Sequence, residues 1–494
     1  MTTPASPGSA PGTGPGAGSA LGVGAGAEAG CGFEAEAVPR RWRAARGVVP
    51  PGHLDAAGCN VPSDRVLDAM TAHLRLERER GGYGAVPDLT AARSALAALV
   101  GPRPDDGASG DAPVRPGGAG AGAERVPAGP GGVAAGPGHM PVAPGGAAAG
   151  PAGVAAGAGQ VAFLESGTAA MAALLGGWRL GPGSRVGCAR TEYGSTLMLL
   201  RRLAARRGWR LVELPVDGDA RIDPDGVRAR LASGLDLVVV SHLGSHHGVV
   251  QPVPEIGALC RAAGVPFVLD VCQSLGHVEV RGAGATAYVG TSRKWLAGPR
   301  GVGFLIVPGL TPAMDAPAPT LSGHLWSGLP PEPGGVWDEP WPEGGGRARG
   351  GETSQWAGAV PVEGAARYES SEGPIAARVG LGVAAQEHHV LGPAAVHAHL
   401  ADLGRTARGL LDGAGGWRVA EPLDEPSALV TLTPPPGDTA ERAAARAAEA
   451  SLLVGVVPTA RAPLHLREPV LRVSPPPGTP LDTLQALARV LATT

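Results

Sequence analysis

The chain has 494 residues, including 80 glycines and 50 prolines, and carries a formal net charge of −3 with a sequence pI near 6.5. Glycine and proline together exceed a quarter of all positions, which is more than an ordinary globular protein contains. Because the basic residues are scattered among acidic ones rather than gathered on one arm, the sequence disfavours nucleic acid and anionic membranes as partners.

Two segments consist almost entirely of Gly, Ala and Pro. Residues 1–30 and about 101–159 have almost no large side chain whose burial could offset the entropy lost on ordering, so we expect both to be disordered. A third biased stretch, at about 327–352, includes Trp and acidic residues, and we expect a loop that orders on binding. The rest, roughly 380 residues, suffices for one large and one small domain.

The cysteines and the N-terminus indicate a cytoplasmic protein. The five cysteines form no CxxC pair and no even set, so we expect reduced and mostly buried thiols. The N-terminus lacks a basic region followed by an apolar stretch, and no run of 18 apolar residues occurs. The cysteines are Cys31, Cys59, Cys188, Cys260 and Cys272.

From Val161 onward, short β-branched runs alternate with helical patterns. This order is typical of right-handed βαβ units, and it predicts an α/β fold with a mostly parallel seven-stranded sheet. The expected strands are 161–166, 185–190, 209–216, 236–242, 266–270, 285–292 and 301–308.

After residue 353 the pattern changes to two long helical stretches, three shorter strands and a final amphipathic helix, which predicts a smaller α+β domain. The predicted organisation is a disordered tail at 1–40, a large domain at 41–325 interrupted by the 101–159 insertion, a loop at 326–352 and a small domain at 353–494. No repeat of solenoid length is visible.

A small-residue turn, Ser166, Gly167 and Thr168, lies between the first strand and a helix. Such a strand-to-helix turn directs backbone N–H groups and the helix dipole at an anion. A Ser-Gly-Thr turn is also an ordinary helix N-cap, and the turn alone leaves both interpretations open.

Asp270 ends the apolar strand PFVLD. A carboxylate at the C-terminal end of a parallel strand lies where such sheets bind ligands, and it could pair with a protonated ring nitrogen. A capping aspartate is the alternative.

Lys294 is the only lysine in the chain, and every other basic side chain apart from histidine is arginine. In this chain arginine stands wherever only a positive charge is needed, but arginine cannot form a Schiff base. An anion cradle, a carboxylate and a single lysine, in this order, are the parts that pyridoxal phosphate (PLP) requires. Lys294 is therefore the candidate nucleophile that holds the cofactor.

At this point the sequence resembles the class V aminotransferases, the cysteine-desulfurase-like branch of fold-type I PLP enzymes. The resemblance covers about 45–100 and 160–494 and implies an aspartate-aminotransferase-like fold, with the cofactor in the large domain. It rests on the ordered motifs SGTAA (166–170), TEYGS (191–195), SHLGSHHGVVQP (241–252), VLDVCQS (268–274) and TSRKWLAGPRGVGFL (291–305).

The resemblance implies a role for each candidate. Gly167 and Thr168 would hold the phosphate, Asp270 would pair with the pyridine nitrogen, Gln273 would contact the ring hydroxyl, and Lys294 would form the Schiff base. The active site would lie at the interface of a homodimer.

Four positions depart from the desulfurase pattern. Tyr193 stands where many members stack a histidine on the cofactor, and an aromatic ring can replace it. Ser245 stands where desulfurases have an asparagine near the ring hydroxyl. Thr291 and Arg293 replace a serine and a histidine that contact the phosphate, and an arginine suits a dianion.

The resemblance also implies how substrate binds. Arg472 stands where the family has the arginine that binds the substrate α-carboxylate, for which the guanidinium fork is suited; an arginine on a surface strand is the alternative. Five segments are similar to the lyase branch of ergothioneine biosynthesis: RRWRAARGVVPPGHLDAAGCNVPS (40–63), ERERGGYGA (77–85), SRKWLAGPRGVGF (292–304), AARVGLGVAAQEH (376–388) and RAPL (461–464). Enzymes of this branch cleave the sulfoxide amino acid hercynylcysteine sulfoxide to pyruvate, ammonia and a sulfenic acid that is reduced to ergothioneine. Candidates for binding the trimethylammonium of this substrate are Tyr83, Trp326, Trp337 and Trp341.

Desulfurases need a cysteine on a mobile loop, yet residues 318–355 contain none. Without that thiol, β-elimination is the route that remains, with Lys294 removing the α-proton. The alternatives are a class V aminotransferase or epimerase acting on another amino acid, a PLP-binding regulator, and a noncatalytic homologue. A metal site at His388, His389, His397 and His399 is disfavoured because Gly-Pro interrupts the segment and no carboxylate completes a set, and His246 and His247 are left without a role.

Overall fold

The computed structural model describes residues 37–101, 157–327, 358–370 and 372–493. Most of the 1–30, 101–159 and 327–352 segments lies outside these residues. In the part of the chain that is described, no helix has the length and apolar character to cross a bilayer.

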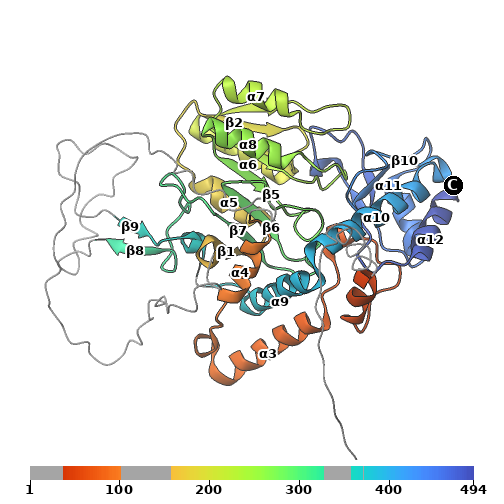
Figure 1. Cartoon of the computed structure of the whole chain (residues 1–494), viewed down its shortest axis with the longest axis horizontal. Coiled ribbons are helices and arrows are strands. Elements are labelled where there is room, and N and C mark those ends of the chain that lie inside the picture. Colours follow the sequence, from red (N-terminus) through yellow and green to blue (C-terminus); the bar gives the residue numbers. More distant parts are fainter. Residues whose placement is uncertain (1–36, 102–156, 328–357, 371, 494) are drawn as a thin grey trace, which may run out of the picture.

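A seven-stranded sheet forms the centre of the larger body (Figure 1). The strand order is β1-β7-β6-β5-β4-β2-β3, and β7 is antiparallel to both of its neighbours while the other neighbouring pairs are parallel. This confirms the predicted fold class. The strands are β1 (Val161–Leu164), β2 (Arg185–Ala189), β3 (Arg210–Leu214), β4 (Leu237–Ser241), β5 (Phe267–Asp270), β6 (Ala287–Thr291) and β7 (Gly303–Ile306).

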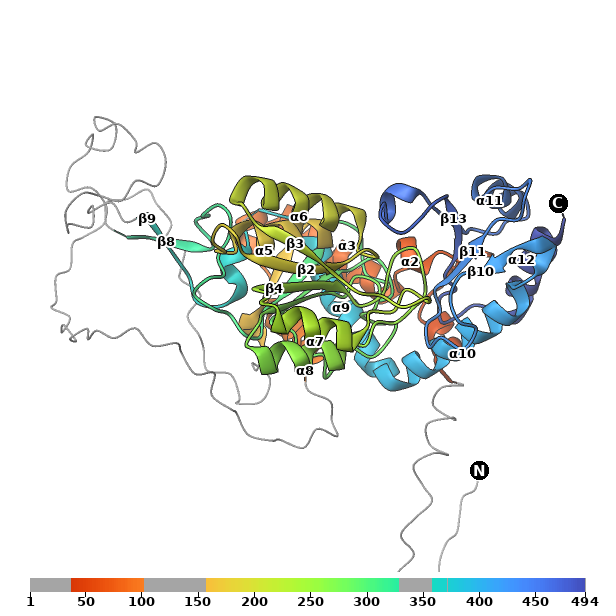
Figure 2. The same ribbon diagram turned by 90° about the horizontal axis from the view of Figure 1, so that it is seen from above.

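Both faces of this sheet are buried, as is usual for parallel sheets with helical crossovers. In β4, Val238 and Val240 belong to one apolar core, whereas Leu237 and Val239 belong to the core on the opposite face. Helices α5 (Gly167–Gly177) and α6 (Gly194–Arg207) cover one face, and α7 (Pro224–Ala232) and α8 (Val253–Ala263) cover the other (Figure 2).

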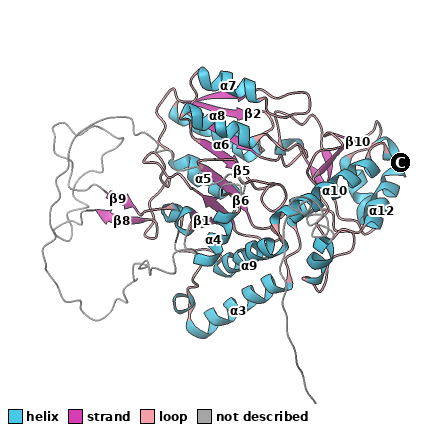
Figure 3. Cartoon of the chain, viewed as in Figure 1, coloured by secondary structure: helices cyan, strands magenta, loops and turns pink. Residues whose placement is uncertain are grey.

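A second, antiparallel sheet of order β10-β11-β13-β12 lies in the C-terminal part of the chain. Its strands are short, and helices pack around it, as Figure 3 shows. The elements are α10 (Pro393–Leu411), β10 (Arg418–Val419), β11 (Val430–Thr433), α11 (Ala440–Glu449), β12 (Gly455–Val457), β13 (Val470–Val473) and α12 (Leu481–Ala492).

The packing divides the chain differently from the predicted ranges 41–325 and 353–494. Leu54, Ala56 and Ala57, near the N-terminus, belong to the core of the C-terminal body, and isolated bridges join residues 53 and 55 to residues 453 and 474. Conversely, α9 (Ile375–Leu391) packs on α3 (Asp64–Arg80) and α4 (Thr90–Ala98) in the larger body.

The remaining elements are short. They are α2 (Ala56–Cys59), the 3-10 helices η1 (Gly82–Ala85), η2 (Ala158–Gln160), η3 (Ala365–Tyr368), η4 (Ala414–Gly416) and η5 (Thr459–Arg461), and a separate hairpin of β8 (His324–Ser327) and β9 (Gly358–Pro361).

Candidate active site

A cavity of about 320 Å³ opens at the C-terminal ends of β2, β4, β5 and β6. Parallel strands place their carboxyl ends at one edge of a sheet, so residues far apart in sequence meet there. All ten residues predicted to bind the cofactor line this cavity: Ser166, Gly167, Thr168, Tyr193, Ser245, Asp270, Gln273, Thr291, Arg293 and Lys294.

The Ser166–Thr168 turn is both an N-cap and a candidate anion cradle. The Ser166 hydroxyl accepts a hydrogen bond from the Ala169 N–H at 3.1 Å, which is the geometry of an N-cap. The N–H groups of Gly167 and Thr168, in the first turn of α5, have no acceptor within the helix. A Cβ on Gly167 would lie 2.5 Å from Cys272 Sγ, so only glycine allows the turn to come this close to β5.

Lys294 follows β6, is half-buried and lines the cavity. Burial lowers the pKa of its amine to about 8 because the ammonium loses hydration, although Cys272 and Asp270 oppose the shift. No ion pair to Lys294 is found among the described residues. The amine therefore releases its proton more readily than an ordinary lysine, whose pKa is 10.5.

Asp270 and Gln273 are held in place by neighbouring groups. Asp270 ends β5, and its Oδ1 accepts a hydrogen bond from the Cys272 N–H at 2.8 Å. The Gln273 amide donates to the Ala57 carbonyl at 3.1 Å and accepts from the Trp295 indole at 3.0 Å. Trp295 in turn stacks on His277 with ring centroids 3.6 Å apart.

A buried carboxylate that the sequence analysis missed, Glu192, lies behind Asp270. Its two oxygens accept hydrogen bonds from the N–H and the hydroxyl of Ser241, both at 2.7 Å. Burial raises the pKa of Glu192 to about 7, and the nearby Asp270 charge adds to the shift. Glu192 lies three residues after the end of β2, and this position alone does not distinguish it from a surface carboxylate.

Arg461 is a second residue that the analysis missed. It comes from η5 in the C-terminal body, lines the cavity, and donates from Nη1 to the Tyr193 hydroxyl at 3.1 Å. Its signal in the sequence is weak, because Arg461 is one of many arginines and lies 268 positions from its partner.

Arg472 lies close to the cavity wall without lining it. Its Nη2 donates to Asp55 Oδ1 at 2.8 Å and its Nη1 to the Ser245 carbonyl at 3.1 Å, while its buried Nε has no partner among the described residues. The structure thus brings Arg472 next to Ser245, and its predicted role at the substrate carboxylate stays a prediction.

Of the aromatic candidates for the substrate tail, Tyr83 is the one whose side chain the structure describes, and it does not line the cavity. The Tyr83 side chain is 88% exposed, and its hydroxyl donates to Glu372 at 3.1 Å. Trp326 lies in β8, and Trp337 and Trp341 fall outside the described residues.

The histidines near the C-terminal helices are held by separate partners. His389 bonds to the Ala95 carbonyl and His399 to the Pro477 carbonyl, while the rings of His388 and His397 lie 5.9 Å apart. The pKa of each of His388 and His397 is lowered, to about 3 and about 4, chiefly by burial.

Three comparisons with known proteins agree with this geometry. Residues 154–325 match the family described as Aminotransferase class-V. A probable hercynylcysteine sulfoxide lyase of Mycobacterium tuberculosis is 34% identical over 464 residues, covering 92% of this chain and 93% of the relative.

Two solved structures share the fold. The apo cysteine desulfurase of Thermococcus onnurineus NA1 superposes with a TM-score of 0.65 at 17% identity, covering 89% of this chain and 93% of that one. A C-DES variant with glycine covalently linked to its PLP cofactor gives a TM-score of 0.64 at 16% identity, covering 90% and 96%.

Proposed function

Because the chain belongs to the class-V aminotransferase family, whose cofactor is PLP, we propose that it is a carbon–sulfur β-lyase that cleaves hercynylcysteine sulfoxide. The full-length similarity to a probable lyase of this substrate supports the proposal. The homodimer and the cytoplasmic location stay predictions.

The cavity residues fit PLP. The glycine-restricted turn at Gly167 offers free N–H groups to a phosphate, and Arg293 and Thr291 lie on the same cavity. The Asp270 carboxylate can keep a ring nitrogen protonated, and Lys294 offers an amine. When bound, PLP supplies an electron sink for negative charge at the substrate α-carbon.

Lys294 can act as the general base of an elimination. With its pKa at about 8, the amine can accept the α-proton without a large energetic cost near neutral pH. The α C–H and β C–S bonds then break, the sulfur group leaves as a sulfenate that takes up a proton, and water converts the three-carbon fragment to pyruvate and ammonia. A thiol reductant would convert the sulfenic acid to ergothioneine.

Cys272 supports elimination over persulfide chemistry. It is the single cysteine among the residues that line the cavity, and burial raises the pKa of its thiol well above the usual range. Its sulfur lies against Gly167 beneath the cradle, where it remains a thiol. Residues 318–355, where a desulfurase would carry its nucleophile, contain no cysteine.

The test compares two substrates on the PLP-loaded protein. With a thiol reductant, hercynylcysteine sulfoxide should yield ergothioneine and pyruvate, while free cysteine should release sulfide or persulfide at most slowly. Lys294→Ala should form neither product. A protein that binds PLP but releases sulfur only from free cysteine would contradict the proposal.

A further inference from the structure

A segment of the C-terminal body, residues 459–465, reaches the cavity through Arg461. At one end, η5 approaches the start of α6 so closely that a Cβ on Gly194 would lie 2.1 Å from the Ala460 carbonyl oxygen. The contact is therefore possible only because residue 194 is glycine. It places Arg461 on the cavity beside Tyr193.

The other end of the segment is anchored by histidines. His465 Nδ1 lies 2.8 Å from His246 Nε2, and the rings of His246, His247 and His465 meet edge to face. The pKa of each of these rings is lowered, chiefly by burial, so they stay neutral at neutral pH and place no charge opposite Arg461.

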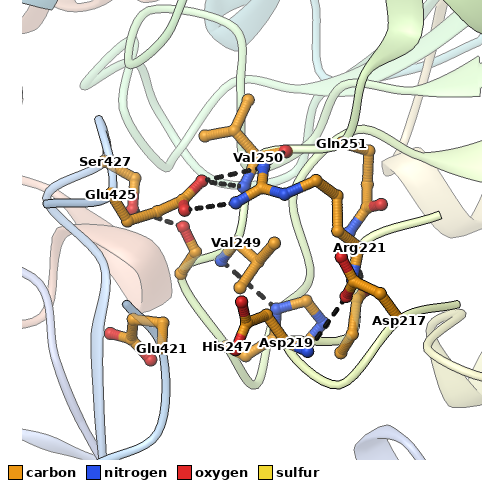
Figure 4. A network of polar contacts seen from close by, with 12 residues as sticks. Asp217, Asp219, Arg221, His247, Val249, Val250, Gln251, Glu421, Glu425 and Ser427 are labelled. Carbon is orange, nitrogen blue, oxygen red and sulfur yellow. Dashed lines mark hydrogen bonds and ion pairs between the residues drawn. The ribbon is translucent and has the colours of Figure 1, made fainter. Parts of the chain in front are cut away.

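This histidine group is a structural anchor rather than a free set of metal ligands. The Val249 N–H donates to His247 Nδ1 at 3.2 Å, so the proton of the neutral ring is on Nε2 and that nitrogen has no lone pair for a metal. The loop that carries His247 is fixed in turn, because Glu425 accepts from the Val250 N–H and from Arg221, and Ser427 donates to the Gly248 carbonyl (Figure 4).

Arg461 is a free cation at this anchored position. Its guanidinium carbon lies 5.7 Å from the centre of the Tyr193 ring, and no carboxylate pairs with it among the described residues. The exposed Arg202 of α6 also lines the cavity. Two cations for which the described residues offer no acidic partner therefore line this cavity.

Arg472 is held at a different place. It is paired with Asp55 and donates to the carbonyl of Ser245, a residue of the cavity wall, whereas Arg461 donates to Tyr193. Of these two arginines, Arg461 is the one that lines the cavity.

We infer that Arg461 binds the carboxylate of the substrate's betaine tail and thereby determines specificity for a sulfoxide with two carboxylates. The inference rests on the proposed function, because hercynylcysteine sulfoxide carries one carboxylate at the cysteine α-carbon and a second on the trimethylated histidine. A planar guanidinium with free N–H groups suits this second carboxylate.

The test compares kcat/KM for hercynylcysteine sulfoxide and for S-methylcysteine sulfoxide, which has no tail. Arg461→Met should lower kcat/KM for the first by roughly 30-fold, mainly through KM, and leave the second within about twofold. Arg461→Lys should give an intermediate loss. Arg467→Met is the matched control, because Arg467 is an exposed arginine that follows shortly after Arg461 and does not line the cavity. This variant should change kcat/KM for neither sulfoxide.

A calorimetric titration with hercynine, the tail alone, gives a readout that needs no turnover. Wild type should bind hercynine, and Arg461→Met should weaken this binding by a similar factor. Equal losses for both sulfoxides, or no loss for either, would overturn the inference while the lyase function stands. If wild type cleaves neither sulfoxide, the proposed function fails. The hercynine titration alone then decides whether Arg461 binds the tail carboxylate.

Discussion

Single residues determine most of the chemistry of the cavity. The sequence reveals those residues whose role no other side chain can fill. Lys294 could be identified because it is the only lysine, and Asp270 because it ends a buried strand. Glu192 and Arg461 could not, because their importance comes from burial and from a contact between two bodies of the chain, neither of which leaves a local pattern.

Glu192 gives a prediction about stability and pH. An unfolded glutamate loses its proton near pH 4.5, whereas Glu192 holds its proton to about pH 7 in the fold. The folded state thus binds more protons between these values, so stability falls as the pH rises through this window, by about 3 kcal/mol in total.

Glu192→Gln removes this titration. The difference in free energy of unfolding between variant and wild type should shift in favour of the variant by about 3 kcal/mol from pH 4.5 to pH 7.5. Urea unfolding of the PLP-free proteins at a series of pH values measures it. Because Glu421, whose pKa is also raised to about 7, is present in both proteins, its titration cancels. A pH-independent difference would show that the fold does not raise the pKa of Glu192.

Among the elements, the strands of the parallel sheet could be predicted because short apolar runs alternate with helical patterns. The antiparallel direction of β7 and its pairing with the distant β1 could not, since they depend on tertiary contacts. The start of α5 shows why a single turn could not be explained from its local sequence. Position 167 requires glycine because of its contact with Cys272, a residue more than a hundred positions later.

Gly167→Ala tests this turn. The added Cβ would meet Cys272 Sγ at 2.5 Å and the Gly290 carbonyl oxygen at 3.3 Å, so the turn must move away from β5. We expect a loss of about 2 kcal/mol in stability and weaker PLP binding, measured by urea unfolding and by cofactor absorbance.

Two controls separate contact from helix propensity. Gly409→Ala, where a Cβ would meet nothing within 4 Å in the last turn of α10, should stabilise the protein by up to about 1 kcal/mol. Cys272→Ala in the Gly167→Ala background should restore part of the PLP affinity. If Gly167→Ala bound PLP as wild type does, the turn would not be the cradle.

At the scale of the whole molecule, the two bodies are joined by buried polar contacts as well as by the chain. The Glu425 carboxylate, whose side chain is 2% exposed, accepts hydrogen bonds from the Val250 N–H and from Arg221 Nη2, both at 2.7 Å. The sequence predicted two bodies, but the exchange of the N-terminal residues and α9 between them could not be anticipated from composition or periodicity.

Glu425→Ala should uncouple this junction. The substitution leaves a buried N–H and a partly buried guanidinium without their acceptor, and we expect a loss of about 3 kcal/mol in the free energy of unfolding, together with a higher KM because the 459–465 segment loses its support. Asp424→Ala, at the exposed neighbouring residue, is the control and should change neither quantity. Equal stability of the two variants would contradict the role given to Glu425.

The proposed function requires that Lys294 and PLP carry out β-elimination in this cavity. The most direct measurement is a quantitative NMR assay of all three-carbon and sulfur products formed from hercynylcysteine sulfoxide. We expect one pyruvate for each sulfenic acid or ergothioneine, and no product with Lys294→Ala. Alanine in place of pyruvate, or a keto acid that retains the sulfur group, would contradict it.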